Sequence, residues 1–261
     1  MASLRSVEVQ ETDLSRPLLG LSEPANWCIA ANVTHVIHNA FPVTFKRGVA
    51  SFESQFKIMS HLLQLARDNG ASPRMVFVSS IAAVSQYTSK EDLDGLVAVS
   101  EEPFRPDWKP PAMGYWQAKL ICEKMLEQAV QEGGVDGVIA RSALCLGFLS
   151  YFPLAESRLV LHVENPSRQF WASAMATISE ALTLPILSYK DWLARVRDLA
   201  EDEEHVATLH SFFEKDFSHV GSGKLYLNTT ETKRASPTLR ECGIIRDDIL
   251  RRYVSRTLLS R

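Results

Sequence analysis

The sequence of 261 residues lacks the features that mark membrane and secreted proteins. No apolar run approaches the ~20 residues that a transmembrane helix requires. Residues 1–6 contain no apolar stretch of the kind found in a signal peptide. The formal net charge is −3, so there is no basic excess to favour nucleic acid or an anionic membrane. We therefore expect a cytoplasmic globular protein with no nucleic-acid partner and no membrane partner.

The chain is also poor in patterns that bind metals or form disulfides. Its four cysteines lie far apart, at positions 28, 122, 145 and 242, and no two of them form C-x-x-C. None of the seven histidines belongs to an H-E-x-x-H motif or another ligand spacing. We expect reduced, mostly buried thiols and no metal site.

Hydrophobic periodicity predicts strands and helices that alternate through the first 150 residues. The predicted strands are 7–10, 33–40, 75–78 and 138–140, with one more at 159–163. The predicted helices are a short one within 18–32, then 52–67, 115–131, 171–182, 189–199 and 205–217. The polar, proline-punctuated stretch 89–111 is expected to be a loop.

This order of elements is typical of an α/β protein with a parallel sheet. We expect an α/β domain over residues 1–150 and a helix-rich part over residues 151–261. At this length the chain can hold one large domain, or one domain with a smaller appendage.

Two residues on the predicted helix 115–131 carry a chemical signal. Tyr115 and Lys119 are spaced as Y-x-x-x-K, which places both side chains on one face of the helix. A tyrosine has an ordinary pKa of about 10, so it becomes an effective acid at neutral pH only beside a cation that favours its phenolate. Ser80 ends the strand predicted at 75–78, at the sheet edge where ligands bind, and adds a hydrogen-bonding hydroxyl. The three residues form a candidate site for carbonyl reduction, whereas Y-x-x-x-K alone occurs often by chance.

Several motifs resemble the extended short-chain dehydrogenase/reductases. Three carry the general likeness: Val36-Ile37-His38-Asn39-Ala40, Phe77-Val78-Ser79-Ser80 and Gly114-Tyr115-Trp116-Gln117-Ala118-Lys119. Others look like the thioester reductase domains that end fungal non-reducing polyketide synthases and peptide-synthetase-like enzymes: Phe52-Glu53-Ser54-Gln55-Phe56, His162-Val163-Glu164-Asn165-Pro166, Trp192-Leu193-Ala194-Arg195, Asn228-Thr229-Thr230 and Ser236-Pro237-Thr238-Leu239. The resemblance covers nearly the whole chain and implies a truncated dinucleotide-binding, Rossmann-like domain over residues 1–150 and a helix-rich, substrate-side subdomain over residues 151–261.

This resemblance implies an activity and roles for particular residues. Members of the family use NADPH to reduce a carrier-bound thioester to an aldehyde, and some continue to the alcohol. Ser80, Tyr115 and Lys119 match the catalytic serine/threonine, tyrosine and lysine, and Tyr115 and Lys119 also contact the cofactor. The other cofactor positions are Asp13 and Leu14 beside the adenine, and Asn39 and Ala40 beneath a ribose. From the residues alone, Asp13 is more readily explained as a turn residue, and Asn39 is as readily explained as a turn residue that ends a strand.

The sequence departs from the family pattern at its start. The family opens with a strand, a G-x-x-G-x-x-G turn and a helix whose N-terminus receives the pyrophosphate, whereas Gly20 is the only glycine before position 48 here. Gly133-Gly134 follows a predicted helix and precedes a strand, the reverse of the required order. We therefore expect an incomplete Rossmann-type sheet without its first βαβα unit. In that case strand 7–10 would either pair with strand 33–40 or leave it as a sheet edge.

A second departure follows Arg141. The family has a long substrate-lining segment there, but here only about a dozen residues separate Gly147 from the strand at 159–163. The leading interpretation is a thioester reductase. One alternative is a degenerate, cofactor-free fragment that acts as an interaction module, and another is an epimerase or dehydratase of the same superfamily.

Overall fold

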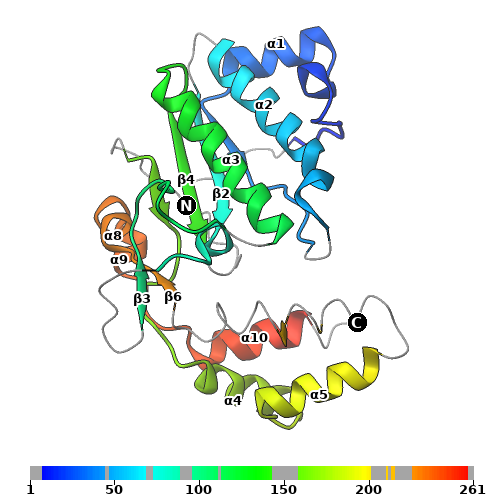
Figure 1. The fold of residues 1–261 in the computed structure, drawn as a ribbon, viewed down its shortest axis with the longest axis vertical. Helices are drawn as coiled ribbons and strands as arrows, with labels where there is room; N and C mark the ends of the chain where they lie inside the picture. Colours follow the sequence, from blue (N-terminus) through cyan, green and yellow to red (C-terminus); the bar gives the residue numbers. More distant parts are fainter. Residues whose placement is uncertain are drawn as a thin grey trace. The chain divides into compact units, whose positions relative to one another are not determined.

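A computed structural model describes residues 8–44, 47–68, 73–88, 96–110, 113–142, 158–200, 210, 213–214 and 225–257. The chain divides into two compact units. The first contains residues 1–86, 102–140 and 158–160, and the second contains residues 87–101, 141–157 and 161–261. The helices and strands of each unit are shown in Figure 1. Among the described residues, no helix combines the length and apolarity needed to cross a membrane.

A four-stranded sheet has the order β1-β2-β4-β5. Its strands are β1 (His35–His38), β2 (Arg74–Ser80), β4 (Gly137–Ser142) and β5 (Val160–His162). β1 pairs with β2 in parallel, with His38 opposite Phe77. The predicted α/β class with a parallel sheet is confirmed, and the four strands overlap those predicted from residue 33 onward.

The first unit also contains helices, some of which pack on the sheet. They are η1 (Pro17–Gly20), α1 (Glu23–Asn32), η2 (Val49–Phe52), α2 (Glu53–Asp68), η3 (Ile81–Val84) and α3 (Gly114–Gln131). In Figure 1, α2 and α3 run side by side in front of β2 and β4. Their inward faces form one core with the strands, in which Met59, Met75, Phe77, Leu126 and Ile139 are almost completely buried.

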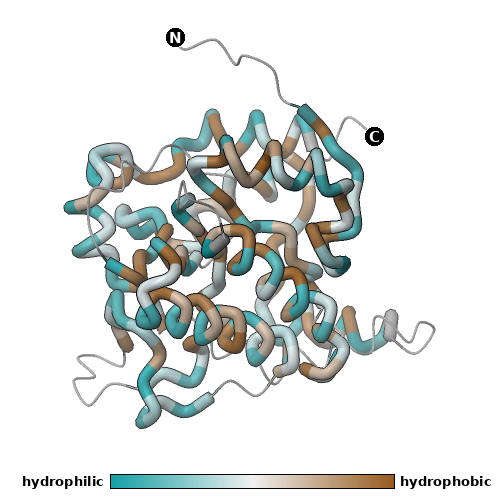
Figure 2. Tube along the Cα trace, turned by 90° about the horizontal axis from the view of Figure 1, so that it is seen from above, coloured by the Kyte–Doolittle hydropathy of each residue, from teal (hydrophilic) through white to brown (hydrophobic). Residues whose placement is uncertain are grey.

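The second unit joins distant segments of the chain. Its strands β3 (Val97–Val99) and β6 (Leu225–Leu227) pair in parallel. Its helices are α4 (Trp171–Leu182), α5 (Tyr189–Ala200), α8 (Thr230–Ala235), α9 (Pro237–Arg240) and α10 (Asp247–Thr257). α4 packs against α10, where the Thr177 hydroxyl donates to Asp247 at 2.9 Å. Hydrophobic and hydrophilic residues alternate along the helical turns, as Figure 2 shows.

Family-like motifs that lie far apart in sequence meet in this second unit. The backbone N–H of His162 donates to the Thr232 hydroxyl at 2.8 Å, and its imidazole bonds the carbonyl of Asn228 at 2.7 Å. The carboxylate of Glu101 accepts backbone N–H bonds from Glu231 at 2.5 Å and Thr232 at 2.9 Å, which caps the start of α8. Together these bonds hold the 162–166 motif against the 228–230 motif.

Three predictions about strands are wrong. Residues 8–10 form no strand, and of the two predicted outcomes β1 is left as an edge of the four-stranded sheet among the described residues, with Ile37 53% exposed. β1 is therefore not the fully buried strand that its β-branched sequence predicts. The predicted loop 89–111 contains β3, whose partner β6 lies more than 120 residues later, beyond the reach of a local pattern. The helix predicted at 205–217 falls almost entirely outside the described residues.

At the start of α3, the backbone of Gly114 lies very close to the backbone at the start of η2. A Cβ atom on Gly114 would lie 2.6 Å from the carbonyl carbon of Gly48 and 2.7 Å from the nitrogen of Val49. Side chains do not tolerate such distances, so only glycine lets the first turn of α3 pack against η2. That first turn carries Tyr115.

We predict that Gly114→Ala lowers the free energy of unfolding by about 1–3 kcal/mol, the usual cost of overpacking. Gly48→Ala is the matched control, because nothing lies within 4 Å of a Cβ at that position. Denaturant unfolding of both variants measures the difference. Equal stability of the two variants would contradict the close approach.

Candidate active site

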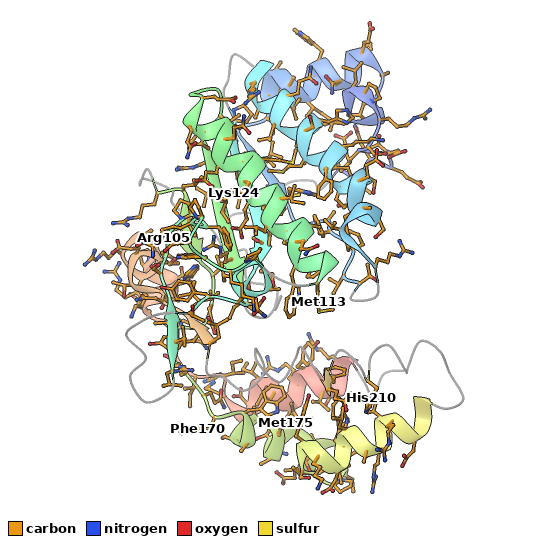
Figure 3. The ribbon with its side chains drawn as sticks, viewed as in Figure 1. Arg105, Met113, Lys124, Phe170, Met175 and His210 are labelled. Carbon is orange, nitrogen blue, oxygen red and sulfur yellow. The ribbon has the colours of Figure 1, made fainter. Side chains whose placement is uncertain are left out.

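The candidate site lies where α3 passes the carboxyl end of β2. Tyr115 and Lys119 occupy the first turns of α3, and Ser80 is the last residue of β2. The ammonium of Lys119 donates to the carbonyl of Val78 at 2.7 Å. Because Val78 is two residues before Ser80, this bond brings Lys119 to the end of β2 that carries the serine. Figure 3 marks the helix by Met113, just before its start, and by Lys124 farther along.

Tyr115 and Lys119 are both withdrawn from solvent. Tyr115 is 6% exposed and Lys119 is 4% exposed. The Tyr115 ring meets Phe41 edge-on at 5.9 Å and lies 6.2 Å from the Phe52 ring, measured between centroids. A buried phenol and a buried ammonium one helical turn apart interact more strongly than they would in water, because little solvent screens them.

Ser80 is held by the turn that it starts. It is the N-cap of η3, where its Oγ accepts the N–H of Ala82 at 3.2 Å. A serine hydroxyl can accept one bond and donate another, so this cap leaves its proton available to a ligand oxygen. The side chain is half-buried, so part of it is accessible to a ligand.

Ser79, the neighbour of Ser80, points to the opposite face of β2 and bonds a residue that the sequence reasoning missed. Ser79 donates to the carboxylate of Glu123 at 2.5 Å, and both residues are 1% exposed. A hydrogen bond to a buried carboxylate is among the stronger ones in proteins, so it ties β2 firmly to α3. The available signal was the spacing, since Glu123 is four residues after Lys119 and shares its helix face.

His38 is a second residue that the sequence reasoning did not place in the site. It ends β1, is 3% exposed, and its ring lies 5.5 Å from that of Phe77. Burial, and then the charge of Lys119, lower the pKa of His38 from 6.5 to about 4. Its Nε2 has no hydrogen-bond partner among the described residues. His38 is therefore a neutral imidazole at physiological pH.

The residues predicted to hold the cofactor fall into two groups. Asn39 and Ala40 are exposed and directly follow β1, whose carboxyl end lies beside that of β2. They therefore lie at the same end of the sheet as Ser80, where the strands have their carboxyl ends. Asp13 is also exposed, and its carboxylate accepts the Ser15 hydroxyl at 2.6 Å and the Ser15 N–H at 3.0 Å, bonds that lower its pKa. Leu14 packs partly into the core.

These residues fit a dinucleotide only in part. Gly20 has a positive φ of 68°, but a Cβ there would lie 2.6 Å from the Asp13 carbonyl, so its role is to close a tight turn. That turn is further closed by the Thr12 hydroxyl, which donates to the Leu19 carbonyl at 2.6 Å. Gly133 and Gly134 lie between α3 and β4, as predicted, and do not begin a helix. Among the described residues, no glycine-rich turn before a helix forms a cradle for the pyrophosphate.

Comparison with known proteins defines the family. Residues 2–161 match the NAD-binding family described as male sterility protein, and the chain belongs to that family. The chain is 35% identical to the 3-methylorcinaldehyde synthase tropA of Talaromyces stipitatus, over 97% of this chain and 12% of that protein. It is 29% identical to an adenylate-forming reductase of Aspergillus terreus, over 97% of this chain and 29% of that protein. The chain thus spans less than a third of the length of either relative.

Solved structures give the same result for the fold. The terminal R domain from the myxalamid PKS-NRPS pathway superposes with a TM-score of 0.71 at 19% identity, over 96% of this chain and 74% of that domain. The reductase domain of the aureusimine biosynthetic cluster gives 0.53 at 14% identity, over 90% and 76%. The predicted kinship with terminal reductase domains of fungal polyketide synthases is therefore confirmed. The alignment with the Talaromyces protein extends over 312 positions, so that protein has residues between the matched segments that this chain lacks.

The buried neutral His38 makes stability depend on pH. Its folded pKa of about 4 is below its ordinary value of 6.5, so the unfolded chain takes up the proton first as the pH falls. We predict that this residue alone removes about 3 kcal/mol of stability as the pH falls from 6.5 to 4. His38→Gln is expected to flatten this part of the dependence, measured by denaturant unfolding at several pH values. The control is His35→Gln, at an exposed position on the same strand, which is expected to keep the wild-type dependence of unfolding free energy on pH. If His38→Gln also kept that dependence, His38 would not be its cause.

Proposed function

We propose that the chain is a carbonyl reductase of the thioester reductase type, with Ser80, Tyr115 and Lys119 acting on the substrate oxygen. The single observation that supports this most is the bond from Lys119 to the Val78 carbonyl, which joins the Y-x-x-x-K helix to the strand that ends in Ser80. Membership in an NAD-binding family supports the reaction class. NADPH is proposed as the cofactor from the family resemblance, and a cytoplasmic location is proposed from the sequence.

The proposed chemistry concerns the oxygen half of the reduction. A carbonyl that receives hydride at carbon develops negative charge on its oxygen and then needs a proton. The Ser80 hydroxyl can donate a hydrogen bond to that oxygen, and the Tyr115 phenol can donate the proton. The charge of Lys119 favours the phenolate that remains on Tyr115.

The proposed substrate is an acyl thioester on a carrier protein. Hydride addition and protonation of the oxygen would give a hemithioacetal, which forms the aldehyde when its C–S bond breaks and the carrier thiol leaves with the hydroxyl proton. The support is kinship with synthases and reductases whose names describe aldehyde formation and reduction. Since the chain spans 12% and 29% of those relatives, the activities of the whole proteins are not assigned to it.

The activity test uses the purified chain with millimolar NADPH and an acyl-pantetheine thioester, followed by NADPH absorbance. We predict that Tyr115→Phe lowers turnover by ~10²-fold or more, the usual scale for losing a general acid. Tyr253→Phe, at an exposed position on α10, is the control and should leave turnover unchanged. Wild-type turnover in Tyr115→Phe would remove Tyr115 from the proposed mechanism.

The alternative proposal is that the chain taken by itself is a cofactor-free interaction module, because the described residues provide no glycine-rich turn before a helix. Hydrogen bonds to charged groups contribute ~1.5–3 kcal/mol each, so losing two weakens binding by ~10²–10⁴-fold.

We predict that this chain binds NADPH with a dissociation constant in the millimolar range or weaker, measured by isothermal titration calorimetry. The starting point is an intact reductase that binds NADPH with a dissociation constant of about one micromolar. A measured dissociation constant of a few micromolar would refute the cofactor-free module and favour a working reductase.

A further inference from the structure

A buried ammonium group is costly unless its surroundings replace the water that it has lost. Lys119 is 4% exposed, and its bond to the Val78 carbonyl replaces one of its water contacts. Aromatic ring faces replace others. Its Nζ lies 4.1 Å from the centroid of the Phe41 ring, 4.9 Å from that of Phe77 and 6.0 Å from that of Tyr115. Distances within about 6 Å allow the ring quadrupole to attract a cation, most strongly where water is excluded.

The charged and titratable groups around Lys119 come from two elements. From β1, His38 is neutral near pH 7, because its pKa is about 4. From α3 come Tyr115, Cys122 and Glu123. Burial raises the pKa of Cys122 to about 12, so its thiol is uncharged. Glu123 is buried and bonded to Ser79.

Phe41 and Phe77 differ in how deeply they are buried. Phe77 is 0% exposed in the middle of β2, where its ring belongs to the core. Phe41 is only half-buried and directly follows Asn39 and Ala40. Its ring stacks on Phe52 at 5.9 Å with an interplanar angle of 18°, which fixes the face that it turns to Lys119.

We propose that Phe41 is a positioning residue, which forms with Phe77 an aromatic cage that keeps Lys119 charged and directed toward Tyr115. The inference rests on the proposed function, because it concerns how the same site is tuned. In this arrangement the ring faces offset the cost of burying the ammonium. Its positive charge can then favour the phenolate of Tyr115. A weaker cage leaves Lys119 more easily deprotonated, and Tyr115 becomes a poorer acid.

The test separates ring electronics from ring shape. Phe41 is replaced, in the full cofactor-free chain, by mono-, di- and trifluorinated phenylalanines, which weaken the quadrupole while nearly preserving the shape. NMR of ¹³Cζ-labelled tyrosine follows the ionisation of Tyr115 with pH. The expected result is a stepwise rise of the titration midpoint, by about one pH unit across the series. The same series at Phe56, which packs on the core from α2, is the control and should leave the midpoint unchanged.

Conventional variants supply a second measurement. Phe41→Trp preserves a cation-binding ring face and is expected to retain the wild-type midpoint, whereas Phe41→Leu is expected to raise it. The proposal would be overturned if the titration midpoint of Tyr115 did not change when Phe41 is fluorinated, or if it rose equally when Phe56 is fluorinated. Because neither NADPH nor substrate is present, a failure of the proposed reductase activity does not affect this test.

Discussion

The burial of the Lys119 ammonium is the constraint on which the rest of the site depends. A charge this far from solvent requires a hydrogen-bond acceptor and polarisable neighbours, which the Val78 carbonyl and the rings of Phe41 and Phe77 provide. To reach that carbonyl, α3 must lie close against β2. The bond between Ser79 and Glu123, one turn farther along α3, holds the same two elements together.

The burial of the Lys119 ammonium also explains why His38 is neutral. Two positive charges in one buried cluster would repel each other, and the cluster avoids this because His38 is neutral. Among the described residues the Nε2 of His38 has no hydrogen-bond partner, which costs some stability. The cluster therefore keeps the Lys119 ammonium without a second positive charge beside it.

The two sides of the proposed reductase site are not equally complete among the described residues. On the side proposed to bind the substrate oxygen, Ser80 caps η3 and the phenol of Tyr115 is enclosed by aromatic rings. The phosphate side has no glycine-rich turn before a helix among the described residues. In the second unit, the bonds that join His162 to Asn228 and Thr232 bring together motifs shared with terminal reductase domains.

The sequence by itself determined the α/β class, the extents of α2, α3 and α4, and the location of the Y-x-x-x-K pair. Each of these follows from local periodicity or fixed spacing along one element. Only the tertiary structure decided which groups surround Lys119, because Phe41, Phe77 and His38 come from segments that no local pattern connects. It also decided that β1 is an edge strand and that β3 exists, since both depend on which distant strand supplies the partner hydrogen bonds. Pairing and burial are properties of segments brought together, so a pattern within one segment could predict its shape but not its neighbours.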